Sequence, residues 1–111
     1  MCDNQMLMKT CQPIPEGTPR ITGHELEHLV SHTAGWEIDD GVLAKVFEFE
    51  DHYQTMAFVN AVAWVSHRED HHPEMIVGYD TCMVGYTTHS IGGLSENDFI
   101  CAANVDHLVG D

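Results

Sequence analysis

The apolar positions of this chain change from a helical to a strand-like spacing soon after residue 30. Leu26, Leu29 and Val30 form a short apolar stripe that repeats every three or four residues, as on one face of a helix. Thr22 and Glu25 stand before this stripe at the spacing of a capping box, in which each side chain satisfies a backbone N–H at the start of a helix. We therefore predict a first helix that begins after Thr22.

Two strands and a long helix are predicted next. Residues 36–38 and 42–49 are rich in β-branched and aromatic residues, and Asp39-Asp40-Gly41 between them is typical of a tight turn. Residues 52–69 return to helical spacing with two apolar stripes, which predicts a helix packed on two sides, by the sheet and by another subunit. Pro73 disfavours helical geometry at the residue before it, so the helix should end near Asp70 or His71.

A second hairpin and a last helix complete the pattern. Residues 75–79 and 82–88 read as strands that turn near Asp80-Thr81, and residues 91–93 read as a loop. Ser95 and Asp98 have capping-box spacing at the start of the final helix. Hairpins of strands interrupted by helices predict an α+β domain, with an antiparallel sheet and helices on one face.

The first part of the chain has no such periodicity. Pro13, Pro15, Gly17 and Pro19 interrupt it, so residues 1–20 are predicted to form a flexible N-terminal arm. Residues 21–111 are predicted to form a single domain, because the chain has 111 residues and one compact core of this size is usual. A domain this small is stabilised only marginally by its own core, which favours a homo-oligomer.

The charge excludes some partners. Asp and Glu number 18 against 4 Lys and Arg, a formal charge of −14 that repels nucleic-acid phosphates and anionic membrane surfaces. The four cysteines are scattered without CxxC spacing, and neither a signal peptide nor a 20-residue apolar run is visible. We therefore expect a cytoplasmic protein with reduced thiols that binds neither nucleic acid nor membrane.

The nine histidines supply the candidate chemistry. His71 and His72 are adjacent at the predicted helix end, between acidic neighbours, and His89 follows a predicted strand where its side chain can enter a cleft. A histidine that titrates near neutral pH can both donate and accept a proton. Asp98 could orient an imidazole or serve only as the capping partner of Ser95, and the residues alone leave both interpretations open.

The residues around these histidines resemble the signature of pterin-4a-carbinolamine dehydratases. The matching positions, in the same order and at the same intervals, are Asp70-His71-His72-Pro73, Tyr79, Thr88-His89, Gly93-Leu94 and Asp98. Apolar residues upstream also fall where that family has them, so the resemblance covers about residues 22–108. One difference is His67, which stands where the family often has an acidic residue.

The resemblance implies a four-stranded antiparallel sheet with three helices packed on one face, in the order α-β-β-α-β-β-α, assembled as a homodimer or homotetramer. It implies a hydro-lyase that dehydrates 4a-hydroxytetrahydrobiopterin to quinonoid dihydropterin, and so recycles the pterin cofactor of aromatic amino-acid hydroxylases. Neither a metal nor another cofactor is expected. The implied catalytic residues are His71 and His89 as general acids, His72 to orient the pterin and Asp98 to support His89. The implied binding residues are Asp70, Pro73, Thr87, Thr88 and Ser90.

Two other functions remain open at this stage. His67 and His71 are four residues apart, as zinc ligands on one helical face often are, and His72 or His89 could complete a metal site. Alternatively, the chain is a non-catalytic module for protein interaction or dimerisation, since the charge of −14 does not oppose contact with another protein.

Overall fold

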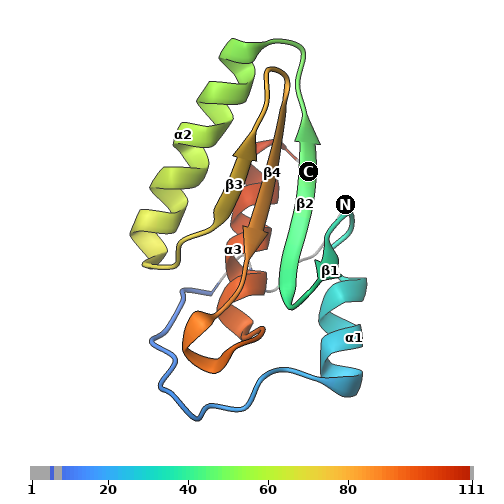
Figure 1. Cartoon of the computed structure of the whole chain (residues 1–111), viewed down its shortest axis with the longest axis vertical. Helices are drawn as coiled ribbons and strands as arrows, with labels where there is room; N and C mark the ends of the chain where they lie inside the picture. The colour runs from blue at the N-terminus through green and yellow to red at the C-terminus, as the bar shows by residue number, and fades with distance from the viewer. Residues whose placement is uncertain (1–5, 7–8, 111) are drawn as a thin grey trace.

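The computed structural model describes residue 6 and residues 9–110 (Figure 1). Its α-helices and strands follow the predicted order. The elements are α1 (Gly23–Ser31), β1 (Glu37–Asp39), β2 (Val42–Glu48), α2 (His52–Glu69), β3 (Glu74–Val77), β4 (Thr81–Tyr86), η2 (His89–Ile91) and α3 (Glu96–Leu108). The short 3₁₀ helix η2 between β4 and α3 was not predicted. The predicted α+β class and the order α-β-β-α-β-β-α are confirmed.

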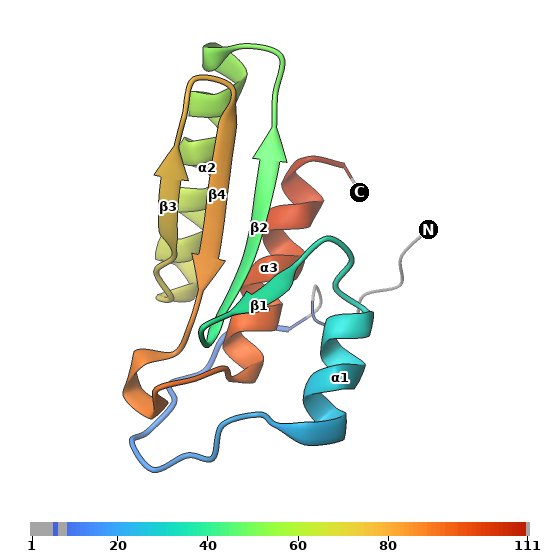
Figure 2. The same ribbon diagram turned by 45° about the vertical axis from the view of Figure 1, so that its right-hand side comes forward.

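The four strands form one antiparallel sheet in the order β1-β2-β4-β3. Helices α2 and α3 pack against each other and against β4, on the same face of the sheet (Figure 2). Helix α1 lies beside the β1 end of the sheet, and its apolar stripe of Leu26, Leu29 and Val30 packs on the core. The end of the sheet where β4 leaves and α3 begins is therefore flanked by several chain segments.

Local sequence explains the tight turn between β1 and β2. Asp40 and Gly41 both have positive φ, 52° and 76°, the combination that a two-residue hairpin loop needs to match the twist of its strands.

The capping box predicted at Thr22 is wrong, because Thr22 is the N-cap of α1 but its side chain makes no capping hydrogen bond. The box predicted at Ser95 and Asp98 is confirmed at the start of α3.

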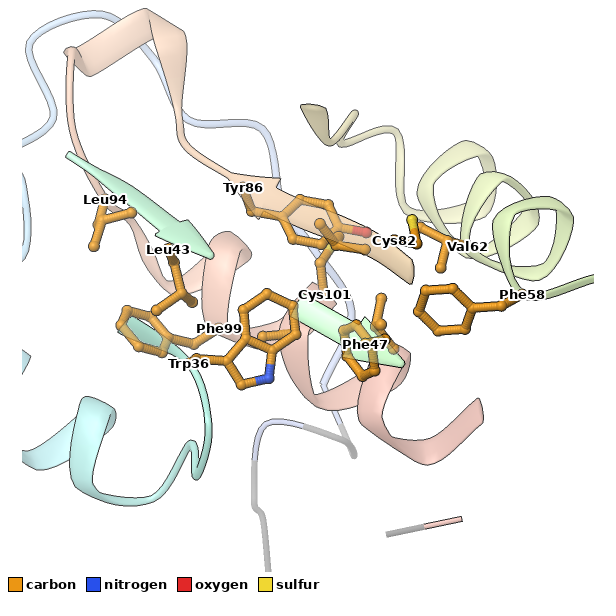
Figure 3. Packing of buried hydrophobic residues seen from close by; sticks show 13 residues of the cluster. Trp36, Leu43, Phe47, Phe58, Val62, Cys82, Tyr86, Leu94, Phe99 and Cys101 are labelled. Atoms are coloured by element: carbon orange, nitrogen blue, oxygen red, sulfur yellow. The ribbon is translucent and has the colours of Figure 1, made fainter. Parts of the chain in front are cut away.

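The core lies between the sheet and helices α2 and α3. Figure 3 shows the rings of Trp36, Phe47 and Tyr86 meeting side chains of both helices, among them Phe58 and Phe99. Trp36 packs edge-on to Phe47, with ring centroids 5.9 Å apart, a favourable arrangement for aromatic pairs. Burial of these rings fixes which face of each strand turns inward, and so fixes the register of the residues that follow β4.

One charged residue, Lys45, shares the inward face of β2 with Leu43 and Phe47. The Lys45 ammonium lies 2.9 Å from Asp106 Oδ1, and Trp36 Nε1 donates to Asp106 Oδ2 at 3.0 Å. The lysine charge is therefore neutralised at the edge of the core, as partly buried charges in proteins generally are.

Helix α2 buries one face and exposes the other. Phe58, Val62 and Val65 are buried, while Tyr53 and Trp64 are 87% and 63% exposed. A second packing partner for this helix therefore stays a prediction. In the part of the chain that the structure describes, no helix combines the length and hydropathy that a membrane crossing would need.

Candidate functional site

The end of α2 positions the two adjacent histidines. The helix ends at Glu69, and Asp70 adopts the left-handed conformation with φ 53° while its N–H bonds back to the last turn. Aspartate tolerates this conformation better than most residues. His71 N–H then donates to Ser66 O at 3.0 Å, which turns the chain sharply back over the helix end. The predicted helix end is confirmed, and this reversal carries His71 inward.

His71 is held by a buried carboxylate. Its Nε2 lies 2.5 Å from Asp98 Oδ1, the His71 side chain is 12% exposed and the Asp98 side chain is fully buried. Because a carboxylate can only accept, the ring nitrogen that faces it carries the proton. The contact therefore selects the tautomer with Nε2–H and leaves Nδ1 free of Asp98. We call His71 and Asp98 the buried pair.

The two oxygens of Asp98 have separate tasks. Oδ2 accepts from Ser95 N–H at 2.8 Å, the capping contact that starts α3, and from the Thr88 hydroxyl at 2.8 Å. Oδ1 is the oxygen that contacts His71. Capping and support of an imidazole, left open by the sequence, are thus performed by the same residue. The resemblance implied that Asp98 supports His89, but the contacts of Asp98 in the described residues go to His71, Thr88 and Ser95, and His89 lies beyond the end of β4, at the start of η2.

One face of the His71 ring is covered by an aromatic side chain. The imidazole stacks on Tyr86 with ring centroids 5.7 Å apart and planes inclined by 10°. The Tyr86 hydroxyl lies 2.9 Å from Ser66 Oγ, in the interior. Burial raises the pKa of Tyr86, more than the hydrogen bond to Ser66 lowers it, so this phenol stays neutral over the physiological range. Tyr86 is therefore a fixed platform for the imidazole.

Two further histidines lie at the surface of the same cavity. His72 and His89 are exposed, and both line a cavity of about 780 Å³ that His71 also lines. We call them the rim histidines. A volume of this order is typical for sites that hold small organic ligands. The structure thus brings together three imidazoles from two separate parts of the chain.

The other expected binding residues fall on the same cavity. Its wall includes Asp70, Pro73, Thr87, Thr88 and Ser90. Thr87 is fixed by its hydroxyl, which donates to Gly41 O at 2.8 Å across the sheet end. Asp98 contacts His71 from behind the wall. Every residue expected to take part is therefore at the cavity or in direct contact with a residue that lines it.

The spacing on which the metal hypothesis depended is not realised on a helix. His71 lies beyond the left-handed Asp70, so it does not share a helical face with His67, which is exposed and lies near Trp64. In residues 6 and 9–110, no three His, Cys, Asp or Glu side chains come together as metal ligands would.

Sequence reasoning missed one side of the cavity. Cys11, Gln12, Pro13 and Ile14 line it, together with Glu69 and other residues of the domain. The arm has no periodicity that could have placed it there. Asn97 also lines the cavity, and its position beside Asp98 was the only available signal.

Comparison with known proteins points in one direction. A family model described as pterin 4 alpha carbinolamine dehydratase matches residues 19–108. A protein of Nitrosomonas eutropha named "Putative pterin-4-alpha-carbinolamine dehydratase" is 54% identical over 110 residues, covering 98% of this chain and 96% of its own. A protein of the same name from Nitrosomonas europaea is 55% identical over 109 residues, covering 97% and 95%.

Two similar solved structures carry names that include further roles. A transcriptional coactivator/pterin dehydratase from Brucella melitensis superposes with a TM-score of 0.79 at 28% identity, over 83% of this chain and all of that one. A pterin dehydratase-like protein identified as a RuBisCO assembly factor in the alpha-carboxysome superposes with a TM-score of 0.59 at 28% identity, over 68% and 88%.

Proposed function

This chain belongs to the pterin 4 alpha carbinolamine dehydratase family, and on that premise we propose that it dehydrates 4a-hydroxytetrahydrobiopterin to quinonoid dihydropterin. The observation that supports this most directly is the buried pair, which fixes one tautomer of His71 in a cavity that both rim histidines also line. In this role the protein returns the pterin cofactor of aromatic amino-acid hydroxylases to its reducible form.

The reaction removes one water molecule from neighbouring atoms of the pterin ring. The bond between ring carbon C4a and its hydroxyl oxygen breaks, and a proton delivered to that oxygen completes the water. The lone pair of the adjacent ring nitrogen forms the new C=N bond, and that nitrogen loses its proton. The nitrogen supplies the electrons, so the step as written needs neither a metal ion nor a prosthetic group.

The proton transfers are assigned to His71 and His89. Asp98 holds the Nε2–H of His71, which directs Nδ1 to the substrate and stabilises the imidazolium whenever the ring takes up a second proton. His89 comes from η2 and serves the other side of the ring, while His72 mainly binds and orients the pterin. Positioned imidazoles contribute about 10²–10⁴-fold through such transfers.

The decisive experiment is the steady-state dehydration of 4a-hydroxytetrahydrobiopterin by the full chain. We expect a rate well above that of the uncatalysed reaction and unchanged in His107→Ala, because His107 is an exposed histidine near the far end of α3. Wild-type protein that leaves the reaction at its uncatalysed rate would contradict the proposal. That result would favour the non-catalytic alternative, since the similar structures include a transcriptional coactivator/pterin dehydratase and a RuBisCO assembly factor.

The assembly and location of the protein are part of the same proposal. We expect a homodimer or homotetramer in the cytoplasm, in which the exposed Tyr53 and Trp64 of α2 are covered by another copy of the chain. Light scattering coupled to size-exclusion chromatography would measure the mass, and a monomer at micromolar concentration would exclude the oligomer.

A further inference from the structure

Part of the cavity wall comes from outside the segment that matches the family model. That match begins at residue 19, yet residues 11–14 also line the cavity. We propose that Cys11–Ile14, here called the arm wall, is a substrate-binding wall of this site and is held in place mainly by Asn97. The proposal rests on the proposed function for its ligand, a pterin.

Asn97 binds the backbone of the arm wall through both its amide oxygen and its amide nitrogen. Gln12 N–H donates to Asn97 Oδ1 at 3.0 Å, and Asn97 Nδ2 donates to Gln12 O at 2.7 Å. This reciprocal pair imitates the bonding of a neighbouring strand, so a single side chain fixes the position and direction of the arm backbone. Asn97 is 7% exposed, so its amide has little water to bond to instead.

Two further contacts attach the arm wall to the site on either side of Asn97. Cys11 N–H donates to Glu69 Oε1 at 2.8 Å, at the end of α2. The Ser90 hydroxyl donates to Ile14 O at 3.0 Å, and Ser90 is the neighbour of the rim histidine His89. Along its length the arm wall therefore contacts the segments that carry both histidine groups.

A wall held this way contributes to binding more than to chemistry. None of its residues offers an acid or base that faces the buried pair in the described contacts, whereas all four of them line the space that the ligand would fill. Released from Asn97, the arm wall would leave the cavity open to water on one side. Loss of contacts shared by the ground state and the transition state raises KM and leaves kcat nearly unchanged.

The test compares Asn97→Ala with Asn104→Ala, a matched change on the same helix whose amide bonds to Ile100 O and to Arg68 and does not line the cavity. We expect Asn97→Ala to raise KM about tenfold with kcat within about twofold, and to lose hydrogen-exchange protection at the amides of Cys11 and Gln12. Asn104→Ala should keep KM and protection. If Asn97→Ala loses protection at Cys11 and Gln12 but keeps the wild-type KM, the arm wall does not bind substrate and the proposal is overturned. If protection in Asn97→Ala is unchanged, Asn97 does not hold the arm wall in place.

A cross-link supplies a rescue that a merely structural defect would not show. Cys11 Sγ and Cys101 Sγ are 3.7 Å apart, and both thiols are free. In a Cys2→Ser background, Cys11 would displace one glutathione from oxidised glutathione, and Cys101 would displace the second to close a disulfide. Closure in Asn97→Ala should return KM to within about twofold of wild type, and Cys101→Ser should prevent the rescue. The proposed position of the arm would be refuted if the Cys11–Cys101 disulfide closed in Asn97→Ala without recovery of KM. It would also be refuted if the disulfide did not form in the protein that keeps Asn97.

Binding of 7,8-dihydrobiopterin, which has no hydroxyl to lose at the reacting carbon, separates this proposal from the proposed function. A wild type that does not dehydrate but binds this pterin, with a Kd about tenfold higher in Asn97→Ala, would end the dehydratase assignment and keep the arm wall. Equal Kd values for wild type and Asn97→Ala would end the arm wall, whatever the dehydratase assay shows.

Discussion

The buried pair and the rim histidines are built in opposite ways around one cavity. His71 is 12% exposed, contacts a fully buried carboxylate and stacks on Tyr86. His72 and His89 are exposed, and no hydrogen bond in the described residues fixes either ring. A ring with fixed partners has a defined tautomer and direction before the ligand arrives, whereas an exposed ring can adjust to the ligand. Preorganisation and adaptability are thus divided between the two regions.

Removal of one imidazole from each region should have the largest effect. We expect His71→Ala and His89→Ala each to lower kcat by about 10²-fold, and the double variant to reach the uncatalysed rate, because each ring serves a different proton. Steady-state dehydration assays of both single variants and the double variant would measure this. A double variant no slower than His71→Ala would assign all proton transfer to the buried pair.

Asp98→Asn should produce the next largest effect, because it removes the acceptor that selects the His71 tautomer. We expect kcat to fall about tenfold to hundredfold, the usual consequence of losing a partner that orients a functional imidazole. The amide keeps one acceptor oxygen, so either His71 or the two donors at the buried Oδ2 face an NH₂ group, and the midpoint of unfolding should fall too. Denaturation followed by circular dichroism would measure the second effect beside kcat.

Asp106→Asn is the matched control for that experiment. Asp106 lies on the same helix and accepts from Trp36 and Lys45, far from the cavity. It should lower the unfolding midpoint and leave kcat of the folded enzyme unchanged. If Asp106→Asn lowered kcat as much as Asp98→Asn does, the effect of Asp98 would be one of stability alone.

His72→Ala should have a smaller effect that is confined to binding. Because His72 is exposed and without a fixing partner, its loss should raise KM about threefold to tenfold and leave kcat within about twofold. His52→Ala is the control, since His52 is an exposed histidine at the start of α2 that stacks on Tyr79. A large fall in kcat for His72→Ala would give this residue a share of the proton transfer.

The smallest effect concerns the acid side of the pH profile. Burial raises the pKa of Glu69, but hydrogen bonds from Cys11 N–H and Arg68 outweigh it, and the pKa lies below its ordinary value of 4.5. A lowered pKa in the folded state stabilises that state above the ordinary value, and the stabilisation is lost as the pH falls through the folded-state pKa. The protection of the Cys11 amide from hydrogen exchange should therefore fall in wild type as the pH drops below about 4.5.

Glu69→Gln removes the titrating group, so the loss of protection at acid pH should disappear in this variant. The neutral amide can still accept from Cys11 N–H, so the arm should stay attached near neutral pH. A wild-type Cys11 amide whose protection is the same at pH 3.5 and pH 6 would contradict the role of Glu69.

Much of the fold was predictable because its signals are local. The left-handed turn at Asp40-Gly41, the capping box at Ser95 and Asp98, and the stop before Pro73 each depend on neighbouring residues. The helical and strand periods then left little choice of fold class. Thr22 shows the limit of this approach, since capping-box spacing states what a side chain can reach and not whether it turns that way.

The sequence indicated which residues lie at the site, but not which of them contact one another. The sequence pointed to His71, His89 and Asp98, but the partner of Asp98 depends on how sharply the chain reverses after α2 and turns away after β4. The arm wall could not be predicted at all, because its contacts run from its backbone to Asn97 and Glu69. Backbone contacts leave no mark on the identity of the residues that make them.

The double task of Asp98 has a consequence for the order in which the protein acquires its properties. Its carboxylate caps α3 with one oxygen and contacts His71 with the other, so the His71 imidazole cannot be held in this position before that helix begins. Dehydratase activity recovered during refolding should then not appear before α3 forms. The time course of that activity would therefore report on the formation of a single helix.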